Sequence, residues 1–305
     1  MARPDRKCLA AGAVESKLTV CVLASGSRGN ATYLSNGQTT ILIDAGLSGI
    51  EIQRRMAARG LDPNKLDAIV VSHEHADHIH GVGVLSRRFD LTVHISDRTL
   101  EAGDATLGNL AAIAPFACGR TFAIGDLTIH PFSISHDAQD PAGFTISTGG
   151  VKIGLATDLG IVTQMVRTHL QCCDILIVEA NHDARMLVDG PYPWHLKQRI
   201  RGRSGHLSND DAASLVETCR HERLMHVVLA HLSAENNTPD KAMETIMMAL
   251  NGTRIELQVA SQAAGSHLLT LPLSRSLHRK AAVDKVGEDL ANGGEALVAV
   301  VGEVE

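Results

Sequence analysis

Six apolar segments of this 305-residue chain each end in an acidic residue or a histidine, and this pattern constrains the fold more than any other feature. The segments are short and rich in Val, Ile and Leu, as expected of buried strands, and longer amphipathic stretches separate them. The residues at their ends are Asp44, His73, His136, Asp158, Glu179 and His231. In proteins built of layered strands and helices, functional sites form where strand ends share one rim. The pattern therefore predicts a layered fold with a polar site along one edge.

The same periodicity places the predicted elements along the chain. Strands are predicted at residues 18–24, 39–46, 67–73, 91–96, 127–136, 151–158, 173–180, 224–231, 254–260 and 266–273. Helices are predicted at residues 48–60, 77–89, 160–170, 182–202, 208–221 and 238–250, with Ser208 and Thr238 as N-caps of the last two. Residues 1–16 are expected to form a flexible N-terminal tail, residues 17–273 one domain, and residues 274–305 a peripheral C-terminal tail.

Composition narrows the classes of function. The formal net charge of -6, with a sequence pI near 6.2, gives no overall basic surface, so any nucleic acid would have to meet a local basic patch. The six cysteines form no CxxC pair, which favours reduced thiols in a cytoplasmic protein. The first residues lack the apolar core of a signal peptide, and no apolar run reaches the length of a membrane span. The oligomeric state stays open, with a homodimer among the alternatives.

The segment SHEHADHIHG, residues 72–81, contains four histidines and one aspartate. In extended backbone, residues i and i+2 point to the same side, so His73 and His75 can bind one ion together. Asp77 and His78, at the predicted turn into a helix, then face a neighbouring position, which favours two ions over one. A solvated polar loop is the alternative, and the HxHxDH spacing favours metal. His80 lies outside this spacing and is expected to be a solvated helix residue.

SHEHADHIHG resembles the signature of the metallo-β-lactamase-fold hydrolases. Further motifs occur in the order found in one subgroup of that family, WalJ (YycJ), whose members are described as exodeoxyribonuclease-like proteins. These motifs are LASGSRGNATYL, ILIDAGLSG, SHDAQDPAGF, ATDLG, VEANHD, GPYPWHLKQRI, GHLSNDDAA and LAHLSAENN, and they cover roughly residues 18–270. The resemblance implies an α+β protein with the metallo-β-lactamase fold, a four-layered αββα sandwich. No long insertion separates Asp158 from His231, so the cap domain of larger RNA-processing relatives is expected to be absent.

The resemblance also implies which residues bind metal. One ion would be held by His73, His75 and His136, and a second by Asp77, His78 and His231, with Asp158 bridging the two. Mixed nitrogen and oxygen ligands suit Zn²⁺, and the hard carboxylates also suit Mn²⁺. The expected cofactors are therefore two divalent metal ions, Zn²⁺ or Mn²⁺.

Three residues are predicted to take part in catalysis at this centre. A hydroxide bridging the two ions would attack the phosphodiester, with Asp77 helping to orient it. By analogy with ribonuclease Z-like relatives, His206 would contact the scissile phosphate or protonate the leaving oxygen; the alternative is a loop histidine ahead of the helix at Ser208. Glu179 would orient His206, as carboxylates near metal sites often do, or is simply a charge at a strand end.

Two segments supply the predicted substrate contacts. The turn SGSRGN, residues 25–30, could cradle a phosphate, although a tight turn that needs glycine explains the same letters. The segment PYPWHLKQRIRGRSGH, residues 191–206, supplies a local basic patch with two aromatic rings, although a charged run is commonly a solvated helix face. The predicted contacts are Ser25, Arg28, Asn30, Tyr192, Trp194, Lys197, Arg199, Arg201, Arg203 and Ser208.

These features favour a binuclear metal-dependent phosphodiesterase that removes nucleotides from a DNA end, and the resemblance suggests 5′ to 3′ polarity. A glyoxalase II-type thioester hydrolase would have similar metal ligands but no need of the basic segment. A ribonuclease Z-like ribonuclease stays open, since no residue shows how the 2′-OH would be read. The non-enzyme alternative is a metal-stabilised nucleic-acid-binding module. A structural metal site should be closed by protein ligands, whereas this ligand set leaves room for a bridging solvent. DNA is therefore favoured over RNA as the partner, and no membrane partner is expected.

Overall fold

Strand β1 (Lys17–Ala24) shows why the chain folds into layers. The structure, a computed structural model, describes residues 17–273. Along β1, Leu18, Val20 and Val22 pack into one hydrophobic core, while Cys21 and Leu23 pack into another. Because side chains of a strand alternate between the two faces of its sheet, both faces of this sheet are apolar and must be covered.

The first sheet has seven strands in the order β14-β1-β2-β3-β4-β5-β6. Besides β1, its strands are β2 (Ala31–Ser35), β3 (Thr40–Ile43), β4 (Ala68–Val70), β5 (Thr92–Ser96), β6 (Ala112–Phe116) and β14 (Leu269–Pro272). The strands from β14 to β3 pair antiparallel, and those from β3 to β6 pair parallel. The carboxyl ends of β3 and β4 therefore meet at one edge.

The second sheet repeats this design in the order β13-β12-β11-β10-β9-β8-β7. Its strands are β7 (Phe122–Ile124), β8 (Leu127–Ser133), β9 (Ala142–Thr148), β10 (Val151–Ala156), β11 (Ile175–Glu179), β12 (His226–Ala230) and β13 (Glu256–Val259). Strands β7 to β10 pair antiparallel, and β10 to β13 pair parallel. Strands β8, β10, β11 and β12 thus run in one direction.

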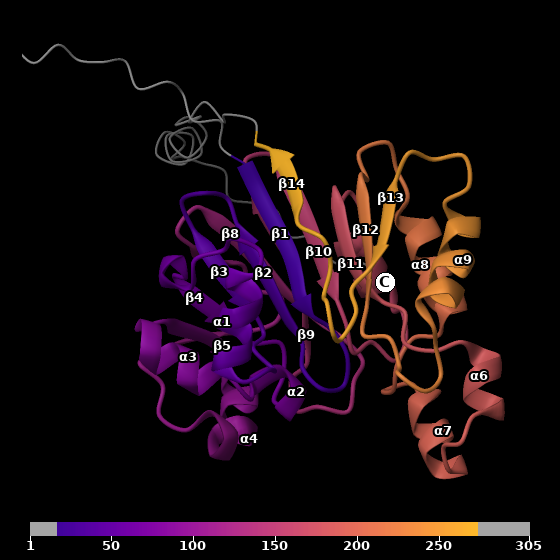
Figure 1. Cartoon of the computed structure of the whole chain (residues 1–305), viewed down its shortest axis with the longest axis horizontal. Helices are drawn as coiled ribbons and strands as arrows, with labels where there is room; N and C mark the ends of the chain where they lie inside the picture. The colour runs from indigo at the N-terminus through magenta and orange to yellow at the C-terminus, as the bar shows by residue number, and fades with distance from the viewer. Residues whose placement is uncertain (1–16, 274–305) are drawn as a thin grey trace, which may run out of the picture. The chain divides into compact units, whose positions relative to one another are not determined.

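Helices cover the outer face of each sheet, which gives the expected αββα sandwich (Figure 1). The helices are α1 (Gly49–Ala57), η1 (Pro63–Lys65), α2 (Ala76–Ile79), α3 (Val82–Phe89), α4 (Asp97–Leu107), α5 (Gln164–Leu170), α6 (Ala184–Asp189), α7 (Trp194–Ile200), α8 (Asn209–Cys219) and α9 (Pro239–Ala249). Three apolar cores result, one between the sheets and one under each helical layer. The α+β fold class is confirmed.

All ten predicted strands occur, with ends shifted by a few residues, and both predicted N-caps are confirmed. Ser208 accepts a hydrogen bond from the Asp211 backbone N–H, and Thr238 accepts one from that of Lys241. The sequence analysis missed β2, β6, β7, β9 and helix α4. Strand β6 was missed because it contains Pro115. Proline argues against a strand, but an edge strand such as β6 tolerates it. The two predicted tails lie outside the described residues.

Two predicted helices were wrong as single elements. The helix at 77–89 is α2 followed by α3, because the chain turns at Gly81, where a Cβ atom would lie 2.2 Å from the backbone oxygen of Leu47. The helix at 182–202 is α6 followed by α7, because Pro191 and Pro193 interrupt it. The predicted helix at 160–170 begins only at Gln164.

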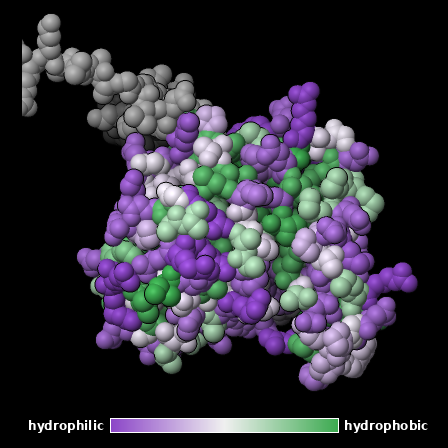
Figure 2. Space-filling view, in the orientation of Figure 1, coloured by the Kyte–Doolittle hydropathy of each residue, from purple (hydrophilic) through white to green (hydrophobic). Residues whose placement is uncertain are grey.

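The surface seen in Figure 2 mixes hydrophilic and hydrophobic residues, and the region of α7 is coloured pale to purple. Within residues 17–273, no helix combines the length and the apolar character that a membrane crossing requires.

Candidate metal centre and active site

The six strand ends singled out from the sequence converge on one rim formed by both sheets. Asp44 and His73 follow β3 and β4 of the first sheet, and the other four residues follow or end strands of the second sheet. Three of these residues have a positive φ: Asp44 (60°), Asp158 (56°) and His231 (56°). Such backbone is uncommon outside glycine, although Asp and His tolerate it better than most residues. It bends the chain at the strand end and is typical of functional sites.

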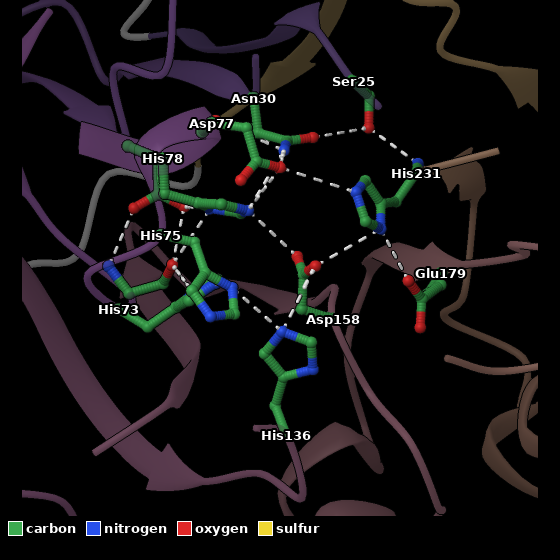
Figure 3. A network of polar contacts seen from close by, with 12 residues as sticks. Ser25, Asn30, His73, His75, Asp77, His78, His136, Asp158, Glu179 and His231 are labelled. Carbon is green, nitrogen blue, oxygen red and sulfur yellow. Dashed lines mark hydrogen bonds and ion pairs between the residues drawn. The ribbon is translucent and has the colours of Figure 1, made fainter. Parts of the chain in front are cut away.

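Three histidines form the first group of ligand-type atoms (Figure 3). The Nε2 atom of His73 lies 3.1 Å from Nδ1 of His75, and Nε2 of His136 lies 3.3 Å from the same atom. The backbone of His75 is extended, so it directs its ring to the same side as His73. These are the three residues predicted from the sequence for one ion.

The second group contains Asp77, His78, Asp158 and His231. Nε2 of His78 lies 3.1 Å from Oδ2 of Asp158 and 3.6 Å from Oδ2 of Asp77. Nε2 of His231 lies 3.8 Å from Oδ2 of Asp77. Asp158 also faces the first group, because its Oδ1 lies 3.8 Å from Nε2 of His136. The structure therefore places Asp158 between the two groups.

Two buried atoms of the second group support a metal-binding role. Oδ2 of Asp158 and Nε2 of His231 have no hydrogen-bond partner among the described residues. Leaving buried polar atoms without a partner costs free energy, and a divalent cation would satisfy both. The residues present therefore fit a metal centre.

Asp44, which the sequence analysis noted but left without a role, supports the second group. Its Oδ2 lies 2.8 Å from Nδ1 of His78, and it accepts hydrogen bonds from the backbone N–H and the hydroxyl of Ser72. With Nδ1 of His78 donating to Asp44, the lone pair of Nε2 faces Asp77 and Asp158. Carboxylates commonly fix the orientation of metal-binding histidines in this way.

Glu179 is fully buried and contacts two histidines at once. Its Oε1 lies 2.9 Å from Nδ1 of His206 and 2.7 Å from Nδ1 of His231. Its Oε2 accepts hydrogen bonds from the backbone N–H groups of Leu159 and Leu207. Ligand-type atoms of Glu179, His206, His231 and Asp158 lie within 4.8 Å of one another, yet both oxygens of Glu179 are already engaged. Its contacts therefore indicate a positioning role.

The charges around Glu179 shift two pKa values. Burial by itself raises the pKa of Glu179, but the adjacent His206 and His231 outweigh burial and lower this pKa to about 2. Burial lowers the pKa of His206, but the charge and the hydrogen bond of Glu179 outweigh burial and raise it. Glu179 is thus ionised, and it holds His206 with Nδ1–H toward the carboxylate.

The turn SGSRGN contacts the second group of ligand-type atoms. The Ser25 hydroxyl accepts a hydrogen bond from the backbone N–H of His231, and the amide nitrogen of Asn30 lies 3.1 Å from Oδ2 of Asp77 and 3.0 Å from Nε2 of His78. Both Ser25 and Asn30 are buried, and Arg28 is exposed. These contacts favour a positioning role for Ser25 and Asn30, and their contact with substrate stays a prediction.

A cavity of about 270 Å³ opens over the two ligand groups, and the other wall of this cavity comes from the segment around α7. Tyr192, Leu196, Arg199 and Ile200 line this wall. Arg199 forms an ion pair with Asp137, with 2.6 Å between Nη2 and Oδ2. The sequence analysis missed Asp137 and Leu196, although Asp137 directly follows His136.

The other predicted substrate contacts do not line this cavity. Trp194, Lys197 and Arg201 border a separate hollow. Arg203 is exposed, and its backbone oxygen accepts a hydrogen bond from the Ser135 hydroxyl. Ser208 is buried at the N-terminus of α8, where its hydroxyl also donates to Asp211.

Two mixed sheets between helical layers, with a rim of histidines and aspartates, define the metallo-β-lactamase fold. In agreement, residues 39–231 match the family described as "Beta-lactamase superfamily domain". The exodeoxyribonuclease YycJ of Bacillus anthracis is 36% identical over 231 residues, which cover 75% of this chain and 88% of that protein. The exodeoxyribonuclease WalJ of Streptococcus pneumoniae is 39% identical over 233 residues, covering 75% and 87%. The chain belongs to the β-lactamase superfamily and, within it, to the family of WalJ and YycJ.

A solved structure shares the fold at lower sequence similarity. The metallo-β-lactamase fold protein YhfI from Bacillus subtilis aligns with a TM-score of 0.67 and 17% identity, covering 84% of this chain and 100% of that chain. This similarity supports the αββα architecture and leaves the substrate to be argued from the site.

Proposed function

We propose that the protein is a metal-dependent exonuclease that removes nucleotides from DNA in the 5′ to 3′ direction. The observation that carries this proposal is one cavity in which metal-ligand groups face a wall with an arginine and a tyrosine. The names of the two relatives support DNA as the substrate. The polarity is inferred from the family resemblance.

Two divalent ions, Zn²⁺ or Mn²⁺, would occupy the two ligand groups. His73, His75 and His136 would hold one ion, Asp77, His78 and His231 the other, and Asp158 would contact both. Bound there, the ions would supply positive charge for a phosphodiester and water of lowered pKa. Asp77 lines the cavity and would orient the attacking water, while Asn30 fixes its carboxylate.

His206 would act on the leaving oxygen. It lines the same cavity as the ligand groups, and its Nδ1 is engaged with Glu179. Its Nε2 is therefore the atom that remains to donate a proton or a hydrogen bond to a phosphate oxygen. Because Glu179 also holds His231, one carboxylate would align a metal ligand with the group that assists departure of the leaving oxygen.

Arg199 and Tyr192 would bind the nucleotide at the strand end. Arg199 is the only lysine or arginine lining the cavity within the described residues, so it is the group best placed to neutralise a phosphate. The Tyr192 ring offers a flat surface for a base. A generic thioester would need neither residue, which favours the nuclease over the glyoxalase II-type alternative.

The test is degradation of 5′-phosphorylated, end-labelled DNA and RNA by protein loaded with Mn²⁺ or Zn²⁺, beside the Asp158→Ala variant and a generic thioester. Stepwise loss of nucleotides from the 5′ end of DNA, absent in the variant, is the expected result. Thioester turnover with intact DNA would overturn the proposal, and faster loss of RNA than of DNA would identify a ribonuclease instead.

A further inference from the structure

Helix α7 separates two surfaces that differ in their relation to the metal centre. Leu196, Arg199 and Ile200 line the catalytic cavity. Residues on the other side of the helix border a second hollow of about 370 Å³, and we call them the outer face of α7: Trp194, Lys197, Gln198 and Arg201. Successive helical residues turn by about 100°, so these four positions share one face, opposite the residues that line the cavity.

The outer face presents one aromatic ring and two cations to solvent. Trp194 is the only tryptophan of the chain, and it is 63% exposed. The Lys197 ammonium donates a hydrogen bond to the backbone oxygen of Val188 and keeps further donors for a ligand. Arg201 is exposed, and among the basic residues of this segment only Arg199 is ion-paired within the described part of the chain.

This combination is complementary to a nucleic-acid strand. The chain carries a net charge of -6, and the carboxylates of Asp77, Asp137 and Asp158 line the catalytic cavity, so the protein as a whole does not attract a polyanion. Lys197 and Arg201 lie four positions apart and provide a local region of opposite sign. Single strands bind where such cations lie beside an aromatic ring, because phosphates meet the charges and bases stack on the ring.

We propose that the outer face of α7 binds the nucleic-acid strand beyond the nucleotide being cleaved, with a base on Trp194 and phosphates on Lys197 and Arg201. The inference rests on the proposed function and adds to it a binding surface outside the catalytic cavity. Because the outer face points away from the metal-ligand groups, it contributes to binding of long substrates and not to the chemical step.

The test compares substrates of different length. Trp194→Ala and the double variant Lys197→Ala/Arg201→Ala are assayed on a dinucleotide and on a long oligonucleotide, with Trp194→Phe as the conservative replacement. The matched control is Lys65→Ala/Arg254→Ala, which removes the same charge from exposed positions ahead of β4 and β13, on the edge opposite the metal centre.

We expect KM for the long oligonucleotide to rise about 10-fold in Trp194→Ala, with recovery in Trp194→Phe, and to rise far less for the dinucleotide. In the double variant, the slope of log KM against log salt should become shallower by about 1.5. The inference would be overturned if the outer-face variants had the same KM values as the control on both substrates. It would also be overturned if their KM rose equally for the dinucleotide and for the long oligonucleotide. Wild-type protein that degrades no nucleic acid would instead overturn the proposed function.

Discussion

The metal-ligand rim and the segment around α7 are built in opposite ways. The side chains of the rim residues are buried at strand ends, and Asp44, which follows β3, and Glu179, which ends β11, engage Nδ1 of three histidines. The segment around α7 is largely exposed and lies between Pro193 and Gly205. It contacts the rim through the ion pair of Arg199 with Asp137, the residue that follows His136. The sheets thus fix the geometry of the metal-ligand residues, whereas a surface element supplies the residues that would contact substrate, as in many folds.

The sharpest test of this contrast is Asp158→Ala, which removes the carboxylate between the two ligand groups. Activity should fall on the order of 10³-fold or more, since each group loses an oxygen of this carboxylate. The measurements are kcat on end-labelled DNA and bound metal by elemental analysis. His80→Ala is the matched control, because this exposed histidine of the same motif lies outside the site. Full activity in Asp158→Ala would exclude the proposed metal centre.

Metal removal should lower the thermal stability of the whole fold, because the ions would be bound by the buried rim that joins the two sheets. An ion present at a thousand times its Kd stabilises the folded state by about 4 kcal/mol. For a chain of this size, that corresponds to a fall in Tm of roughly 7 °C on chelation. Thermal unfolding with and without chelator measures it, and re-addition of metal should reverse it. A chelator shift of the same size in Asp158→Ala would show that the metal binds elsewhere.

Glu179→Gln should lower kcat at saturating metal, or the metal affinity, by about 10- to 100-fold. Glutamine keeps the shape of the side chain but presents an N–H₂ group in place of one of the two oxygens that accept four hydrogen bonds. Asp174→Asn is the control, because Asp174 is also buried and pairs with Arg223 away from the site. Equal activity of the two variants would contradict a positioning role for Glu179.

Arg199→Ala should have the smallest effect, a rise in KM of about 10-fold with little change in kcat. Arg199→Lys should recover part of the loss. Asp137→Asn separates the two contacts of Arg199, because it removes the ion pair and leaves the guanidinium for a phosphate. Equal losses in Arg199→Ala and Asp137→Asn would show that the ion pair, rather than a phosphate contact, is what matters.

Much of the fold could be predicted from the sequence, and the misses included strands without a continuous apolar run and breaks within predicted helices. Strands with continuous apolar runs, such as Ile175–Glu179, were recognised because both of their faces are buried. Strand β9 was missed because its small and polar residues lack this pattern, although it is buried between β8 and β10. The break between α2 and α3 depends on close contact of Gly81 with Leu47, which no local pattern reveals.

The predicted substrate contacts also divide into what the sequence shows and what depends on the tertiary structure. The residues 191–206 were recognised as one basic and aromatic segment, because composition is visible in any sequence. Which of its side chains face the cavity depends on where α7 begins, and Pro193 sets that start. Arg199 faces the metal centre and Trp194 faces away for this reason.

The sequence by itself determined the residue types of the rim. The type of each residue gives its ligand chemistry, and its position at the end of an apolar strand predicts the edge of the sheet on which it lies. Only the tertiary structure decided which carboxylates hold the metal-ligand histidines. Glu179, which the sequence analysis expected to orient His206, also contacts His231, 52 positions away, and Asp44 contacts His78 across 34 positions. Such pairs form when strands and loops distant in sequence are brought to one edge of the packed sheets, and local spacing carries no record of that packing.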